Sequence, residues 1–174
     1  TLLSRILFKK YLSLGETYLL SLLGYATHGL LDACTSYGTQ LLWPFSDERI
    51  SWNYISVVDP FLSIPVILSI IFAIIMKNKL ITLFGILYIF IYLIFGAFQE
   101  NRAQFVGQSI ANLRGHESKH LTSKPSLGNL FLWKTIYEDS GFYYVDAVRL
   151  FSNLEYCQGT KIKKLDLLND FLEL

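Results

Sequence analysis

The chain has 174 residues, of which 52% are hydrophobic and 17% charged, and its formal net charge is +1. Soluble domains usually carry nearer a quarter of charged residues, so the composition indicates a membrane protein. The near-neutral charge provides no basic face for nucleic acid, and no direct binding of nucleic acid is expected. Cys34 and Cys157 lie far apart in different kinds of sequence, which indicates two free thiols.

The N-terminal part is predicted to contain a basic amphipathic turn and a membrane helix. Residues 2–12 place apolar side chains on one side and three basic ones on the other, as at a membrane surface, although the frayed start of a longer helix would look the same. Ser13 and Glu16 have the spacing of a capping box, so a helix is expected to begin there. It would continue over residues 17–33, close to the roughly 20 residues that cross a bilayer.

The middle of the chain is predicted to form a loop followed by a helical hairpin. Residues 34–59 mix aromatic and polar side chains, which suits a membrane–water boundary. Asp59 followed by Pro60 predicts the start of a second helix. Two apolar runs, at residues 61–76 and 80–98, are separated by a short basic turn and predict an antiparallel transmembrane hairpin.

The composition changes after Phe98, and a smaller domain is expected there. The last membrane helix should continue as an amphipathic helix to Gly115. The other elements expected are a strand at 121–125, a β-hairpin of residues 130–138 and 142–150, and a helix at 164–174. The predicted fold is therefore mainly α, with about three integral membrane helices in residues 1–98 and a small α+β domain in residues 99–174.

Basic residues indicate how these segments would be oriented. They precede the first predicted helix and form the turn at residues 77–79, so both ends should be cytoplasmic. Three crossings would then place the 34–59 loop and the C-terminal domain outside. Nothing before Thr1 resembles a start or a secretory signal, so the chain is expected to be a fragment.

His28 and Asp32 are the strongest candidates for chemistry. Residues four apart share one face of a helix, so this imidazole and this carboxylate can bind one divalent cation, for which zinc is well suited. Burying an unpaired carboxylate costs several kcal/mol, so Asp32 in an apolar helix requires a cation or a donor. The alternative is that the two side chains merely bond to each other or to a neighbouring helix.

Further residues are expected around this pair. Asp59 could be another ligand or a catalytic base, although its ordinary role would be the N-cap of the second helix. Four residues could support a ligand or shape access at the rim, although Thr and Ser in helices more often bond back to their own backbone: Thr27, Thr35, Ser36 and Trp43.

Two other groups have suggestive spacing. His116 and His120 are also four apart, but they follow a glycine that ends a helix, and a solvated loop is the expected setting. Glu100 and Arg102 come at the exit of the last membrane helix, where they could reach the same rim as Asp59 or form an exposed ion pair.

Residues 24–46 and 55–60 closely resemble a bacterial family of inner-membrane proteins classed as metal-dependent hydrolases, some of which carry the label LexA-binding. The resemblance extends through residues 124–126 and 132–134. Family members usually begin with a further segment that contains a His-Arg-x-x-Thr-His-Ser motif, which is not in this chain. The resemblance therefore implies that His28 and Asp32 are the second half of a larger site.

The same family is distantly similar to zinc-dependent phospholipase C and P1-type nucleases, which bind metals through helical His-x-x-x-Asp pairs. This similarity implies a phosphoester or lipid substrate, attacked by metal-activated water at the membrane surface. The expected function is a multi-pass hydrolase of the bacterial inner membrane, in which His28 and Asp32 bind the metal and Asp32 and Asp59 are catalytic. The alternatives are a non-catalytic membrane scaffold whose C-terminal domain binds a protein partner, and an ion or proton carrier.

Overall fold

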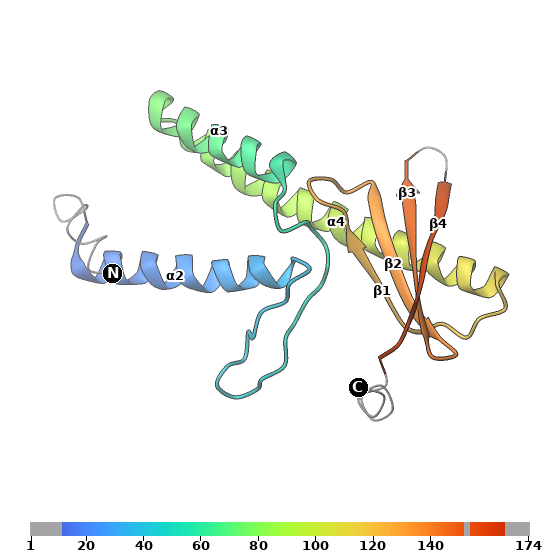
Figure 1. Ribbon diagram of the computed structural model, residues 1–174. Helices are drawn as coiled ribbons and strands as arrows, with labels where there is room; N and C mark the ends of the chain where they lie inside the picture. The colour runs from blue at the N-terminus through green and yellow to red at the C-terminus, as the bar shows by residue number, and fades with distance from the viewer. Residues whose placement is uncertain (1–11, 152–153, 166–174) are drawn as a thin grey trace. The chain divides into compact units, whose positions relative to one another are not determined.

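The computed structural model describes residues 12–151 and 154–165 (Figure 1). The chain divides into two compact units, Thr1–Trp52 and Asn53–Leu174, and each is described separately. The boundary expected after residue 98 stays a prediction. The amphipathic turn expected at residues 2–12 lies outside the described residues, apart from its last residue. The same holds for the helix expected at 164–174, apart from its first two residues.

The first unit contains one long helix and a returning loop. Helix α2 spans Leu14–Ala33 and begins with the predicted capping box, in which Ser13 is the N-cap. The Glu16 carboxylate accepts a hydrogen bond of 2.8 Å from the backbone N–H of Ser13, and the Ser13 hydroxyl accepts one of 3.3 Å from the backbone N–H of Glu16. The loop then folds back on itself through an antiparallel pair of Thr39 and Ile50.

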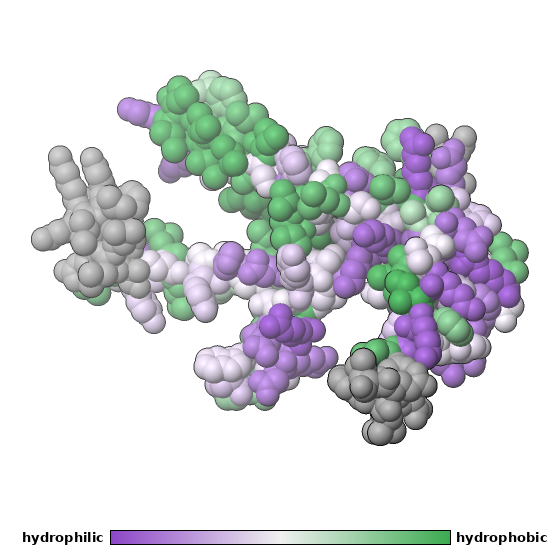
Figure 2. Space-filling view, viewed as in Figure 1, coloured by the Kyte–Doolittle hydropathy of each residue, from purple (hydrophilic) through white to green (hydrophobic). Residues whose placement is uncertain are grey.

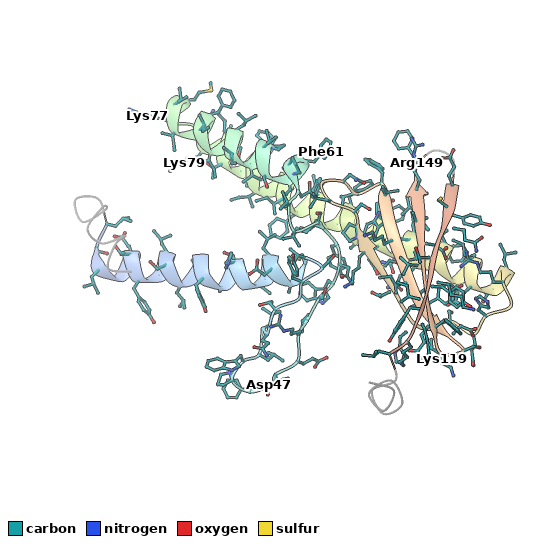
Figure 3. All side chains as sticks on the ribbon, in the orientation of Figure 1. Asp47, Phe61, Lys77, Lys79, Lys119 and Arg149 are labelled. Atoms are coloured by element: carbon teal, nitrogen blue, oxygen red, sulfur yellow. The ribbon has the colours of Figure 1, made fainter. Side chains whose placement is uncertain are left out.

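Two helices begin the second unit and form the predicted antiparallel hairpin (Figure 1). Helix α3 spans Pro60–Met76 and α4 spans Lys79–Leu113. Lys77 adopts a left-handed conformation, with φ of 50°, which ends α3 and allows the chain to reverse; Figure 3 labels Lys77 and Lys79 at this turn. Figure 2 shows the apolar surface of this hairpin, which continues over the first half of α4.

The predicted fold class is wrong. Among the described helices, only α4 is both long and apolar enough to cross a membrane. Helix α3 is apolar but shorter, with 17 residues, and α2 is long enough, but its Ser, Thr, Gly and His residues lower its hydropathy. The chain is therefore not a mainly helical protein with about three membrane helices, because it also devotes a large part of its length to a sheet.

Four antiparallel strands form a sheet in the order β1-β2-β3-β4. Their bounds are Lys119–Pro125, Leu132–Asp139, Phe142–Leu150 and Leu154–Lys163. The predicted hairpin is confirmed as β2 and β3, where Asp139 pairs with Phe142. Ser140 and Gly141 at its turn have φ of 49° and 77°, as a two-residue hairpin turn with a matching twist requires. Strand β4 has no counterpart among the elements predicted from the sequence.

The second half of α4 covers one face of this sheet (Figure 1). The side of α4 that faces the strands carries small residues, among them Ala103, Gly107 and Ala111, all of them buried. Strand β2 alternates, so that Trp133 and Tyr137 are fully buried beneath the helix. Small residues on the helix and aromatic rings on the sheet thus build the core of the second unit.

Candidate functional site

Helix α2 places His28 and Asp32 on one face, as a spacing of four residues requires. The Nε2 atom of His28 lies 3.4 Å from Oδ2 of Asp32. The two side chains are 71% and 48% exposed. An imidazole nitrogen and a carboxylate oxygen thus point to the same region of space, where both are open to a third group.

The sequence predicts a cation at Asp32 from the burial of this carboxylate in a membrane helix, and the structure does not show this burial. Helix α2 does not qualify as a candidate span, and Asp32 is about half exposed. In such a setting an ion pair contributes little, about 0–1 kcal/mol, and needs no further compensation.

The side chains expected around this pair bond mostly to their own backbone. The Thr27 hydroxyl donates to the carbonyl of Leu23 at 2.8 Å, and the Thr35 hydroxyl donates to the carbonyl of Asp32 at 2.7 Å. The Ser36 hydroxyl oxygen is buried and has no hydrogen-bond partner within the described part of the chain. Trp43 lies in the returning loop with 67% of its surface exposed.

Asp59 is the N-cap of α3 and is almost fully buried. Its Oδ1 atom accepts hydrogen bonds from the backbone N–H groups of Phe61 and Leu62, at 3.1 and 3.3 Å. Its Oδ2 atom accepts one of 2.8 Å from the hydroxyl of Tyr92 on α4. Both carboxylate oxygens are therefore engaged in holding the hairpin together, and a part in catalysis stays a prediction.

His116 lies in the loop between α4 and β1, as expected, but its side chain is half-buried. Its Nδ1 atom lies 2.9 Å from the hydroxyl of Tyr137, and its ring centroid lies 4.5 Å from that of Tyr144. His120 is exposed and belongs to β1. The two histidines therefore do not form a pair on a single face.

Glu100 and Arg102 do not bond to each other in the described residues. Glu100 is buried and accepts a hydrogen bond from the side-chain amide of Gln104. Arg102 donates to the side-chain oxygen of Gln99 at 2.9 Å. Each side chain is bonded along its own helix, so the exposed ion pair considered from the sequence is absent here.

A polar cluster that sequence reasoning missed lies between α4 and the sheet. Arg114, the C-cap of α4, donates two hydrogen bonds to the carboxylate of Asp146 at 2.7 and 2.9 Å, and a third of 3.0 Å to the hydroxyl of Tyr137. The bonds to Asp146 hold the pKa of Arg114 well above its usual value. No sequence signal marks this cluster, because its members are far apart in the chain and come together only when α4 packs on the sheet.

No group of three or more His, Cys, Asp or Glu side chains is arranged to bind a metal within the part of the chain that the structure describes. His28 and Asp32 offer at most two donor side chains, whereas a structural or catalytic zinc ion uses three or four protein ligands. The arrangement can contribute to a metal centre and cannot complete one.

Comparison with protein families gives a match to the first part of the chain. The model of a family described as YdjM inner membrane protein matches residues 1–103. No curated protein and no solved structure matches the chain. The family description places the chain at the inner membrane and specifies no reaction. The match includes α2, α3 and the first two thirds of α4, and it covers more than half of the sequence, so the chain belongs to the YdjM inner membrane protein family.

Proposed function

We propose that this protein is a membrane-bound metal-dependent hydrolase in which His28 and Asp32 supply two of the metal ligands. One observation carries the proposal: the His28 Nε2 and Asp32 Oδ2 atoms lie 3.4 Å apart on an open face of α2. This donor set fits zinc, which prefers imidazole nitrogen and carboxylate oxygen at about 2.0–2.2 Å. Two ligands on adjacent turns of one helix also hold each other at a nearly fixed separation.

The residues of this chain would bind and orient. His28 and Asp32 would bind through Nε2 and Oδ2, and the backbone hydrogen bonds of α2 would hold their Cα atoms about one helical turn apart. A bound divalent cation would supply a Lewis acid at this face, with a phosphoester as the proposed substrate. Trp43, in the exposed loop of the same unit, is proposed to contact the substrate at the lipid–water boundary, where tryptophan is enriched.

Membrane attachment is assigned in this proposal to the hairpin of α3 and α4. Helix α4 has the length and hydropathy of a membrane span. Apolar side chains point outward from both helices, and most of them are about half exposed or more in the protein alone. Such a surface is stable in lipid and unfavourable in water, where it would exceed the apolar patches that soluble monomers expose.

The test is the metal content of the full-length protein, purified from its membrane and compared between variants. We expect zinc to be lost from His28→Ala and from Asp32→Ala. The matched controls His120→Ala and Asp47→Ala each remove an exposed residue of the same type elsewhere and should retain zinc. Equal zinc in all five proteins would exclude the proposed role of the pair.

A second candidate function is a non-catalytic membrane scaffold. It is favoured by the exposure of His28 and Asp32, because an exposed imidazole and carboxylate at 3.4 Å also form an ordinary surface ion pair. In that case the sheet of the second unit would bind a protein partner. The experiment above separates the two functions, since a scaffold predicts that neither alanine variant changes the metal content.

A further inference from the structure

One end of the sheet carries exposed apolar side chains. The last residue of β1, the first residue of β2 and the last residue of β3 are at this end of the sheet. The β1–β2 loop and the residue after β3 therefore lie close together. Three side chains lie in these segments, with exposed fractions of 76%, 40% and 56%: Leu127, Phe131 and Phe151. We call these three side chains the collar.

Two contacts join the segment that carries the collar to α4, at the point where the apolar run of α4 ends. The side-chain amide of Gln99, which is almost fully buried, donates to the carbonyl of Leu130 at 3.1 Å. The ring of Phe131 meets the ring of Phe95 edge to face, with centroids 6.2 Å apart. Phe131 in turn meets Phe151 at 5.4 Å. A continuous row of rings therefore leads from the apolar run of α4 to the end of the sheet.

Helix α4 is one uninterrupted helix of 35 residues. Because Phe131 contacts Phe95 of this helix, the collar has a fixed position along the helix axis. Phe98, next to the fastening point, is 58% exposed, and the guanidinium of Arg102 lies 5.8 Å from the centre of its ring. An arginine can lay its apolar stem along an apolar surface while its guanidinium extends to headgroup phosphate, so Phe98 followed one turn later by Arg102 suits a membrane boundary.

We propose that the collar lies in the headgroup region of the same membrane that contains α4, so that the sheet is docked on the bilayer surface. The proposed occupant of this surface is lipid, because the ring contacts of Phe95, Phe131 and Phe151 join the collar to the apolar run of α4. This inference rests on the membrane insertion of α4 proposed above. The docking also gives the sheet a fixed position at the bilayer, with the end that carries the collar toward the lipid.

Depth measurements on the full-length protein test the docking. The natural thiols are removed as Cys34→Ser and Cys157→Ser, and a nitroxide is attached to a single new cysteine. The probe sites are Leu127→Cys and Phe151→Cys in the collar, Phe90→Cys within the apolar run of α4, and Leu113→Cys at the far end of α4. All four side chains are more than half exposed, which leaves room for a label.

Each labelled protein is placed in vesicles of phosphatidylethanolamine and phosphatidylglycerol, and the collision rates of the nitroxide with oxygen and with a water-soluble nickel chelate are compared. Leu113 lies 15 residues beyond Phe98, about 22 Å farther along the helix axis, and its label should be fully accessible to nickel. We expect the Leu127 and Phe151 labels to be protected from nickel at least threefold relative to Leu113. The Phe90 label should be protected more strongly still.

The pattern of results separates the two proposals. If Phe90 is protected while both collar labels are as accessible to nickel as Leu113, the anchor stands and the docking is wrong. If Phe90 is also accessible, membrane insertion of α4 fails, and the docking fails with it. Leu127 decides the outcome if the label at Phe151 disturbs its contact with Phe131.

Discussion

Arg114 and Asp146 form a two-point ion pair that joins the end of α4 to the middle of β3. The N–O distances are 2.7 and 2.9 Å, and the Asp146 side chain is only 2% exposed. The same carboxylate accepts a hydrogen bond of 3.1 Å from the backbone N–H of Gly159 on β4. Because Arg114 also donates to Tyr137 on β2, one buried cluster links the helix to three strands.

Replacing Asp146 with Asn should destabilise the second unit strongly. The substitution leaves the guanidinium of Arg114 largely buried without its counter-charge, which typically costs about 3–5 kcal/mol. We expect a loss of about 3 kcal/mol, because Arg114 retains some contact with water. Thermal unfolding of the full chain in detergent, followed by near-ultraviolet circular dichroism, measures the change.

Glu155→Gln is the matched control for this change. It removes the charge from an ion pair with Arg149 in which both side chains are at least 60% exposed. Exposed pairs contribute about 0–1 kcal/mol, so the control should unfold nearly as the unchanged protein does. Similar unfolding of the Asp146 and Glu155 variants would show that the buried pair does not hold the sheet to α4.

The pKa of Tyr137 predicts how this cluster responds to alkali. Burial raises the pKa of Tyr137, while the hydrogen bond and the charge of Arg114 act in the opposite direction and reduce the rise. A tyrosine in the unfolded chain ionises near pH 10. Because the folded pKa is higher, the contribution of this group to stability is complete below about pH 10 and is lost as the pH rises toward the folded value.

Absorbance at 295 nm measures this ionisation. The difference between the folded protein and its Tyr137→Phe variant should contain one tyrosine that ionises only above about pH 10. In denaturant the same difference should titrate near pH 10, together with the other tyrosines. A difference curve that is the same in the folded and the unfolded protein would contradict the proposed burial effect.

Local signals were sufficient for most helix ends and for one hairpin. The capping box of Ser13 and Glu16 marked the start of α2, and Asp59 before Pro60 marked the start of α3. The Asp-Ser-Gly turn placed β2 and β3 in register. Each of these features depends on residues within a few positions of one another. A short stretch of sequence is therefore enough to predict it.

The missing elements depend on distant partners. Strand β4 is rich in polar residues, contains Gly159, and is exposed from Glu155 to Lys163, so no alternation of apolar residues marks it. It forms because β3 offers an edge for pairing. The ring contact of His116 with Tyr144 and the ion pair of Arg114 with Asp146 likewise require the finished sheet. The candidate site itself needed only the helical spacing of His28 and Asp32.

The hydrogen bond between Tyr92 and Asp59 predicts a coupled pair in the hairpin. Asp59→Ala removes the N-cap of α3 and should cost about 1–2 kcal/mol. Asp59→Asn should cost less, since an amide oxygen can still accept from the helix N–H groups. Tyr92→Phe removes one hydrogen bond to a charged group, worth about 1.5–3 kcal/mol.

A double-mutant cycle measures the coupling of this pair. If the hydroxyl of Tyr92 acts mainly on Asp59, the double variant Asp59→Ala with Tyr92→Phe should be more stable than the sum of the single losses by about 1 kcal/mol. Thermal unfolding in detergent supplies the four stabilities. Additive losses would mean that Tyr92 stabilises the hairpin through other contacts.

Gly96 predicts a close approach between α4 and the segment before α3. A Cβ atom at this position would collide with the backbone carbonyl of Tyr54, and backbone cannot move aside as a flexible side chain can. Gly96→Ala should therefore destabilise the second unit by about 1–3 kcal/mol, although alanine is the better helix former.

The control is Gly24→Ala in α2, where a Cβ meets nothing within 4 Å and helix propensity alone should stabilise by up to about 1 kcal/mol. Opposite signs for the two substitutions, measured by thermal unfolding in the same detergent, are the expected result. A stabilising Gly96→Ala would mean that Tyr54 does not lie against α4.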